Sequence, residues 1–147
     1  IGVSNFTKDQ FDKAVELSDA PILVNQVEYH PFIDQTKLLA EAGHKGSALT
    51  AYCPLAQGRV FKNETIKMIA ERYGVTPAQI VLRWFVQQPG VVAIPRSSNP
   101  EHIRQNFAID EIHLDGDEMA RISALRMHHD RIVDPDFAPV WDNPLAA

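Results

Sequence analysis

The stretch of sequence that decides the fold is TPAQIVLRWFVQQPGVVAIPRSSNPE, residues 76–101. Thr76 is a helix N-cap followed by proline at the first helical position, and Gln79 completes a capping box three residues after the cap. The apolar run Val91–Ile94 then predicts a buried strand. Asn99, directly before a second proline, starts another helix. A succession of helix, strand and helix is typical of a parallel α/β fold.

The rest of the chain continues this alternation. Further strands are predicted over Ile1–Ser4, Ile22–Glu28 and Leu49–Cys53. Helices are predicted from the capping box Thr7–Gln10 to Pro21, from Asp34 to Gly43, over Glu64–Arg72, from Thr76 to Pro89, from Asn99, and from Asp115, which caps with Glu118. Strict alternation implies a parallel sheet covered by helices. Four strands are half of the eight in a closed (β/α)8 barrel, so we expect either a compact doubly wound domain or about half a barrel.

Composition and charge narrow the class of protein. The chain has 147 residues, of which 45% are hydrophobic and 22% charged, as in ordinary globular proteins. Its net charge of −5 argues against a nucleic-acid or anionic-membrane surface. No apolar run reaches the ~20 residues of a membrane span. A single cysteine, Cys53, excludes a disulfide framework and a cysteine-based zinc site, and His128–Asp130 lacks metal-ligand spacing, so no metal site is expected. We expect a cytoplasmic protein.

The organisation of the chain is simple. No linker divides it, so residues 1–147 are expected to form a single unit that ends in a proline-rich tail over residues 127–147. The opening residues Ile1–Phe6 read as the middle of a strand, and we take the sequence as a piece of a longer protein.

Polar side chains gather where the predicted strands end, which in parallel α/β folds is where ligands bind. They are Ser4, Asn5, Asn25, Gln26, Glu28, Tyr52, Arg96, Ser97, Ser98 and Asn99. The last four precede a helix N-terminus, where free amides, hydroxyls and a guanidinium suit a phosphate. The alternative is that Asn99 is only an N-cap and Arg96 only a surface charge. Neither a Gly-rich dinucleotide fingerprint nor a Walker motif is present.

Four ordered motifs carry a resemblance to a known family. They are IGVSNF (residues 1–6), NQVEYHP (25–31), AYCPL (51–55) and IPRSSNP (94–100), and they resemble the successive strand motifs of the aldo-keto reductases. The closing DRIVDP (130–135) and APVW (138–141) resemble the tail of the bacterial diketogluconate-reductase branch. The resemblance implies a (β/α)8 barrel that binds NADP(H). The motifs match its last four strands, so the chain is expected to be a parallel half-barrel of strands five to eight.

The resemblance also assigns the strand-end residues to one NADP(H) molecule. It implies that Ser4, Asn5 and Gln26 bind the nicotinamide carboxamide, that Tyr52 stacks on the nicotinamide ring, that Leu55 and Gln57 lie along the pyrophosphate, that Arg96, Ser97, Ser98 and Asn99 hold the 2′-phosphate, and that Gln105 and Asn106 lie near adenine. Two assigned positions depart from the family. His102 stands where Arg is frequent, and Cys53 where Ser is frequent.

The family's catalytic Asp, Tyr, Lys and His lie on the first four strands of its barrel. No catalytic residue is therefore expected in this chain, and the chain alone is predicted to be inactive. The implied parent reaction is hydride transfer between NADPH and a small aldehyde or ketone. The alternative function is a non-catalytic nucleotide-binding or assembly half-barrel, and an unrelated doubly wound domain is a third reading.

A half-barrel would leave the inner face of its sheet uncovered. We therefore expect some of the apolar strand residues Val3, Val24, Leu49, Ala51 and Val92 to face water. Implied partners that would cover this face are the N-terminal half of a barrel or a second copy of this chain.

Several other residues have two readings each. Tyr29 and His30 resemble an acid pair but belong to the motif after the family's sixth strand. Glu28 is either catalytic or a charge satisfied inside the barrel. Trp141 or Phe137 would touch substrate or cofactor if the tail folds over the barrel mouth, as such tails do in the family. Cys53 lacks any sign of an activated thiolate.

Overall fold

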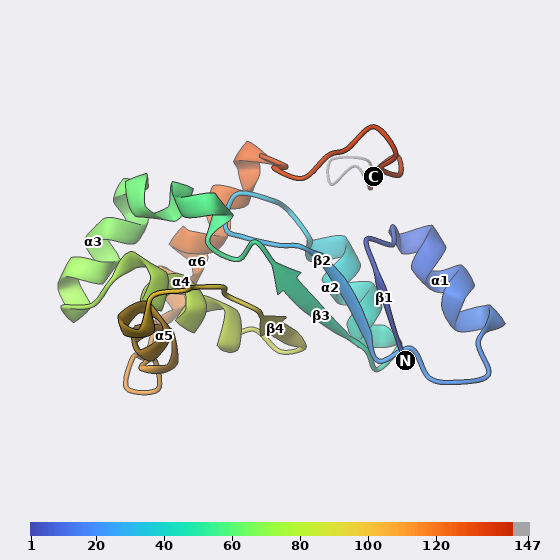
Figure 1. Cartoon of the computed structure of the whole chain (residues 1–147), viewed down its shortest axis with the longest axis horizontal. Helices are drawn as coiled ribbons and strands as arrows, with labels where there is room; N and C mark the ends of the chain where they lie inside the picture. The colour runs from blue at the N-terminus through green and yellow to red at the C-terminus, as the bar shows by residue number, and fades with distance from the viewer. Residues whose placement is uncertain (143–147) are drawn as a thin grey trace.

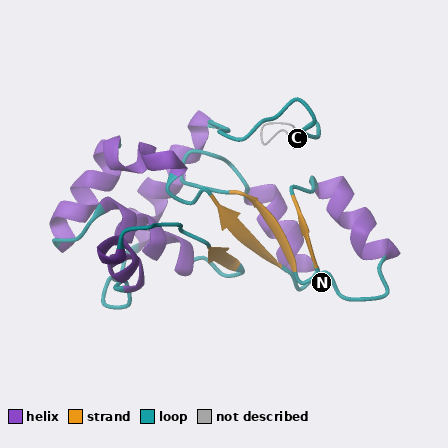
Figure 2. Cartoon of the chain, viewed as in Figure 1, coloured by secondary structure: helices purple, strands orange, loops and turns teal. Residues whose placement is uncertain are grey.

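The computed structural model describes residues 1–142 and shows a parallel sheet with helices along one face (Figures 1 and 2). In chain order the elements are β1 (Gly2–Ser4), α1 (Lys8–Leu17), β2 (Val24–Glu28), α2 (Thr36–His44), β3 (Ala48–Tyr52), the 3-10 segment η1 (Ala56–Lys62), α3 (Glu64–Tyr73), α4 (Pro77–Val86), β4 (Val91–Ala93), α5 (Pro100–Phe107), α6 (Gly116–Ala124) and the 3-10 segment η2 (Leu125–His128). Every strand and helix predicted from the sequence is present, whereas η1 and η2 were not predicted.

Local sequence explains why most helices start where they do. The capping boxes predicted at Thr7, Thr76 and Asp115 are all confirmed. The predicted start of α2 at Asp34 is two residues early, because Asp34 accepts hydrogen bonds from the backbone N–H and hydroxyl of Thr36 before the helix begins. The predicted ends of α1 and α4 are late, since these helices end at Leu17 and Val86 rather than at Pro21 and Pro89.

The sheet order is β1-β2-β3-β4 and every pairing is parallel, as predicted. The register places Val3, Asn25, Leu49 and Val91 side by side in one row across the sheet. Because side chains alternate between the two faces, this row and the rows two residues away face the same way. The carboxyl ends of all four strands consequently meet along one edge.

The two faces of the sheet differ in burial. Leu49 and Ala51 are 0% exposed on the face that the helices cover. Val92 lies on the opposite face and is 51% exposed. The expectation that some of the apolar strand residues face water is therefore confirmed by Val92, whereas the alternation directs Leu49 and Ala51 toward the helices.

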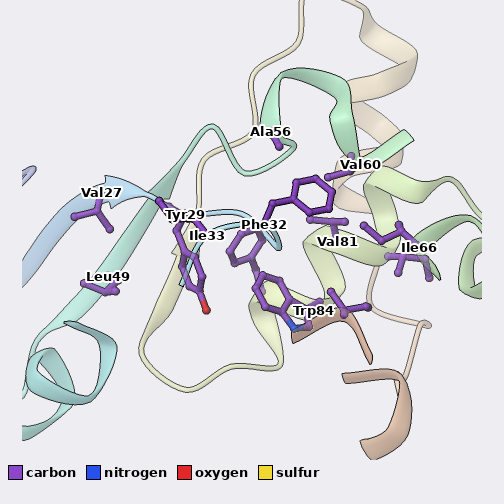
Figure 3. Close-up of a cluster of buried hydrophobic side chains, with 14 of the residues drawn as sticks. Val27, Tyr29, Phe32, Ile33, Leu49, Ala56, Val60, Ile66, Val81 and Trp84 are labelled. Atoms are coloured by element: carbon purple, nitrogen blue, oxygen red, sulfur yellow. The ribbon is translucent and has the colours of Figure 1, made fainter. Parts of the chain in front are cut away.

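The hydrophobic core joins buried residues of the sheet to residues of α1, α2, α3, α4 and α6 (Figure 3), with α2 packed on β3 and α4 on β4. Trp84 and Phe85 on α4 are 2% and 0% exposed, which confirms that they are core residues. Tyr29 meets both edge-on, with ring centroids 5.6 and 5.2 Å away. Phe11 and Ile66 belong to the same buried set, from α1 and α3. This packing holds the strands, and with them the strand ends, in place.

The tail runs back across the molecule after η2, toward the start of α1 (Figure 1). The backbone N–H of Asp130 donates to the carbonyl of Phe32 at 2.8 Å, and the N–H of Lys8 donates to Oδ2 of Asp142 at 2.8 Å. We call residues 130–142 the strap. Residues 143–147 of the predicted tail lie outside the described residues. Within residues 1–142 no helix is long and apolar enough to cross a membrane.

Candidate cofactor site

Three strand ends bring one group of predicted residues together. Ser4 Oγ and the backbone N–H of Asn5 both donate to the carbonyl of Gln26 at 2.9 Å. From the end of β3, the Tyr52 hydroxyl donates to Oδ1 of Asn5 at 2.9 Å. Residues of β1, β2 and β3 thus form one cluster, which we call the amide cluster (Ser4, Asn5, Gln26, Tyr52).

The loops that leave these strands carry unusual backbone angles. Asn5 after β1 and Cys53, Ala56 and Gln57 after β3 have φ values of 57°, 50°, 48° and 50°. Left-handed conformations in residues other than glycine cost energy and concentrate at functional sites. Within residues 1–142, four of the five such residues lie at this edge of the sheet, and His129, which precedes the strap, is the fifth. The strained residues therefore gather at the edge where the sequence predicted the cofactor site.

A second group of predicted residues shares one cavity. The cavity has a volume of about 250 Å³, and its walls are formed by Leu55, Phe61, Thr76, Ala78, Ser97, His102, Gln105 and Asn106. Five of the eight were predicted cofactor residues, and they come from the loop after β3, the loop after β4 and α5. The space is several times the ~30 Å³ of a liquid water molecule. Apolar walls with amide and imidazole groups at one side suit a flat heterocyclic base.

The start of α5 offers a group for a phosphate. Asn99 caps the helix by accepting from the N–H of Glu101 at 2.9 Å, and Ser97 Oγ accepts from the N–H of Asn99 at 3.1 Å. The Arg96 side chain makes no hydrogen bond or ion pair with any of residues 1–142. Asn99 is therefore a cap, as one of the two readings expected, while Arg96 remains available to an anion. Ser98 lies between them in the same loop.

Electrostatics at the end of β3 favour neutral side chains. Burial, and then the charge of Glu28, raise the pKa of the Tyr52 hydroxyl, which keeps it protonated as the donor to Asn5. The same two causes raise the pKa of the Cys53 thiol. Cys53 is therefore no activated nucleophile.

Two residues near the strand ends face away from the site. Asn25 is 0% exposed, and its side chain bonds to both backbone groups of Phe6, at 2.9 and 3.4 Å. The prediction that Asn25 lies at the polar edge is wrong. The side chains of the residues next to Gln26 in β2 point to the face of the sheet that the helices cover. Tyr29 is buried, where its hydroxyl donates to Gln88 at 2.7 Å and desolvation raises its pKa. Neither has access to a ligand.

Glu28 is a carboxylate at this edge, and it is fully satisfied. It is 0% exposed and accepts from His30 Nε2 at 2.9 Å. The N–H groups of Ile132 and Val133 donate to its two oxygens at 2.7 and 2.8 Å. Burial alone would raise the pKa of Glu28, but the bonds from His30, Val133 and Ile132 outweigh it and lower the pKa. The reading of a charge satisfied inside the fold fits this environment.

The strap holds the residue predicted to meet substrate. The guanidinium of Arg131 lies 3.7 Å from the centre of the Trp141 ring, and Trp141 Nε1 donates to Asp134 at 2.7 Å. Phe137 is 89% exposed. Sequence reasoning missed Arg131. The signal was Glu28, a charge in a buried strand that requires a partner.

An apolar groove lies at the edge of the sheet, and the described residues form no cluster of metal ligands. An apolar groove of about 560 Å³ runs along the open edge strand β4 and is lined by Leu82, Val86, Val91, Val92 and Phe107, among others. It shares Asn106 with the cavity of about 250 Å³. Among residues 1–142, no three His, Cys, Asp or Glu side chains converge as metal ligands.

These features agree with what the family comparison finds. The model of the aldo/keto reductase family matches residues 1–127, and the chain belongs to that family. The family is one of NADP(H)-dependent oxidoreductases, whose fold is a parallel (β/α) barrel. The four-stranded parallel sheet of this chain matches part of such a barrel.

Two curated relatives match nearly the whole of this chain. Methylglyoxal reductase DkgB of Escherichia coli O157:H7 is 37% identical over 97% of this chain and 53% of its own length. Aldose reductase B of Dictyostelium discoideum is 39% identical over 97% of this chain and 47% of its own length. The chain thus spans about half the length of the curated relatives it matches.

Two solved structures also match nearly the whole of this chain with about half of their own length. A crystal structure of "a putative 2,5-diketo-D-gluconic acid reductase B" is 44% identical, with a TM-score of 0.93 over 97% of this chain and 51% of that chain. A mutant of Gox0644 in complex with NADPH is 34% identical, with a TM-score of 0.86 over 95% of this chain and 51% of that chain.

Proposed function

We propose that this chain is the C-terminal half of an NADP-dependent aldo-keto reductase barrel, its strands five to eight, and that its strand ends bind NADP(H). The observation that carries the proposal is the shared cavity. Leu55, Ser97, His102, Gln105 and Asn106 were assigned to the cofactor from sequence, and the fold brings them around one space. Residues that were assigned to one ligand by sequence motifs rarely converge unless that ligand shaped the site.

The amide cluster suits the nicotinamide carboxamide. The Oδ1 of Asn5 is occupied by the Tyr52 hydroxyl, so the Asn5 amide N–H groups are left to donate to a ligand carbonyl. Gln26 and Ser4 flank it with further donors and acceptors, and the Tyr52 ring supplies a flat surface for the nicotinamide. Leu55 and Gln57 lie in the loop after β3, where we place the pyrophosphate, and Leu55 also lines the cavity that we assign to the adenine.

The start of α5 suits the 2′-phosphate. Arg96 supplies an unpaired guanidinium, Ser97 and Ser98 supply hydroxyls, and the helix N-terminus supplies amides and the positive end of its dipole. Guanidinium-phosphate bonds are charge-assisted and favour NADPH over NADH, which lacks this phosphate. The cofactor preference of the site therefore rests on this loop.

NADPH, when bound, supplies the hydride that reduces a carbonyl. This chain binds and orients the cofactor, while the proton-donating residues belong to the other half of the barrel. The substrate is a small aldehyde or ketone, and Trp141 on the strap contacts it. The half that completes the barrel is an N-terminal half or, in a homodimer, a second copy of this chain.

Replacing Arg96 tests the cofactor assignment. Arg96→Ala in the protein as its gene encodes it should weaken NADPH binding by roughly 10- to 100-fold, the equivalent of one charge-assisted hydrogen bond of about 1.5–3 kcal/mol. NADH binding should stay within about twofold. Arg104→Ala is the matched control, because Arg104 lies on the helix that follows but pairs with Glu101. Equal loss of both cofactors in a fluorescence titration would contradict the assignment.

The second candidate function is a non-catalytic nucleotide-binding or assembly half-barrel. The observation that favours it is the cavity itself, since Ser97, His102, Gln105 and Asn106 would hold a nucleotide whether or not the protein catalyses a reaction. A reductase assay of the protein as encoded separates the two, since an assembly module binds NADPH without oxidising it in the presence of an aldehyde.

A further inference from the structure

One buried carboxylate, Glu28, holds the middle of the strap, between the contact of Asp130 with Phe32 and that of Asp142 with Lys8. Two successive backbone N–H groups, of Ile132 and Val133, converge on Glu28 at 2.7 and 2.8 Å. Each N–H donates to a different oxygen of the carboxylate, so the one side chain fixes two successive points of the strap backbone. Phe32 N–H donates to Nδ1 of His30, which places the proton of His30 on Nε2, where it donates to Glu28. His30 thereby orients the carboxylate toward the strap.

The contact extends from Glu28 to Trp141 through one residue. The guanidinium of Arg131 lies 3.8 Å from Oε2 of Glu28 and 3.7 Å from the centre of the Trp141 ring. Only 12% of the Arg131 side chain is exposed, so the stacking is largely desolvated, where a cation-π contact is strongest. Glu28 therefore fixes the backbone of the strap directly and its aromatic side chain through Arg131.

The position of Glu28 places the strap beside the reacting end of the site. Glu28 and Tyr52 are register partners in neighbouring strands, so both side chains leave the same face of the sheet at its carboxyl end. The charge of Glu28 reaches the Tyr52 hydroxyl, as the raised pKa of Tyr52 reflects. The surface on which we place the nicotinamide and the anchor of the strap are thus adjacent.

We propose that Glu28 is a positioning residue for carbonyl substrates. Its carboxylate, oriented by His30, holds the strap so that the stacked pair Arg131 and Trp141 forms one wall of the substrate pocket. A loop without anchors samples many conformations, and fixing it on each binding event costs affinity. The pre-formed hydrogen bonds to Glu28 remove that cost. The substrate role rests on the proposed function, whereas the anchoring of the strap does not.

The test compares two buried glutamates in the protein as its gene encodes it. Glu28→Gln retains size but places an amide N–H group opposite an N–H donor of the strap or of His30. Glu118→Gln is the matched control: Glu118 is 2% exposed and accepts from Arg72, Tyr73 and the N–H of Asp115, at 2.8–3.0 Å, without touching the strap. Hydrogen exchange of a peptide covering residues 130–142 reads the strap directly.

We expect Glu28→Gln to speed amide exchange in residues 130–142 by about tenfold or more while Glu118→Gln leaves it unchanged, since one charge-assisted hydrogen bond contributes roughly that factor. We also expect KM for an aldehyde to rise about tenfold in Glu28→Gln, with the dissociation constant of NADPH within about twofold of wild type. If Glu28→Gln speeds exchange in all helices, as a misfolded protein would, Arg131→Met replaces it, and the same changes confined to the strap are expected.

Each result decides a separate claim. Unchanged exchange in the strap overturns the anchoring role of Glu28. Faster exchange with an unchanged KM overturns the substrate wall. An equal rise of KM in Glu118→Gln shows a general effect of buried charge loss and overturns the assignment to Glu28. A wild-type protein that binds no NADPH refutes the proposed function but leaves the exchange result standing.

Discussion

The Tyr52 hydroxyl donates a 2.9 Å hydrogen bond to Oδ1 of Asn5 and so joins the ends of β3 and β1 across the end of β2. The two residues are 47 positions apart in sequence. The bond fixes which side of the Asn5 amide is free for a ligand. Asn5 itself holds a left-handed backbone conformation that few residues other than glycine and asparagine adopt at low cost.

The two roles proposed for Tyr52 separate in two variants. Tyr52→Phe keeps the ring and loses the bond to Asn5, so NADPH affinity should fall by about tenfold or less, the value of ~0.5–1.5 kcal/mol for one neutral hydrogen bond. Tyr52→Ala also loses the stacking surface and should lose more. Isothermal titration with NADPH measures both. If the two variants bind equally well, the ring does not stack on the cofactor.

His102 gives a prediction in the opposite direction. It lines the cavity of about 250 Å³ together with Ser97, at a position where the family often carries arginine. His102→Arg adds a permanent positive charge beside the 2′-phosphate loop and should tighten NADPH binding several-fold, with a salt-dependent gain because the loop is solvent-accessible. NADH serves as the control ligand and should respond little. Weaker NADPH binding in His102→Arg would place the phosphate elsewhere.

The lowered pKa of Glu28 predicts that the free energy of unfolding depends on pH. Its folded-state pKa lies below its ordinary value of 4.5, so its contribution is fully present above about pH 4.5 and is lost as the pH falls through the folded pKa. Glu28→Gln should therefore destabilise the fold at neutral pH, by about 1.5–3 kcal/mol for loss of a charged acceptor, and by progressively less below about pH 4.5. Urea unfolding at about pH 7, 5 and 3.5 measures the difference. A difference that stays constant over this range would mean that Glu28 does not titrate with a lowered pKa.

The 147-residue chain alone should not reduce aldehydes. General acid catalysis contributes about 10²–10⁴-fold, and we place the groups that would supply it in the other half of the barrel. The measurement is NADPH oxidation with methylglyoxal by purified material of this length, and mixing with a separately expressed N-terminal half of a relative's barrel is the positive control. Turnover by the pure chain would show that the catalytic residues are present in it.

The 147-residue chain should also self-associate. Val92 is half exposed on the uncovered face, and the groove of about 560 Å³ along β4 carries Val86, Val91 and Phe107 beside the edge of the sheet. Sedimentation at micromolar concentration should show a dimer, with two sheets approximating eight strands. Val92→Lys should shift the balance to monomer, and Lys13→Gln on α1, which lies beyond the other end of the sheet, should not. A monodisperse wild-type monomer without dye-binding apolar surface would refute the expectation.

Particular residues show which parts of the fold the sequence predicts. Local signals were sufficient for the helix starts that carry a capping box, because a box such as that of Thr76 and Gln79 satisfies its own backbone donors within one turn, whereas α2, which has no side-chain cap, was predicted two residues early. They were equally sufficient for the parallel sheet, since alternation of strands and helices permits few other pairings. The parallel sheet in turn predicted that the polar residues at the strand ends lie together, because parallel strands end at the same edge.

The sequence by itself determined the fold class, the family and five of the eight residues that line the cavity of about 250 Å³. It did not reveal η1 or the left-handed turn at Cys53, Ala56 and Gln57, where tertiary packing overrides the preference of these residues for other conformations. Nor did it reveal how the strap is held. Glu28 bonds backbone N–H groups 104 and 105 residues away, and every residue except proline carries such a donor, so no side-chain pattern marks the partner. Only the packed chain brings them together.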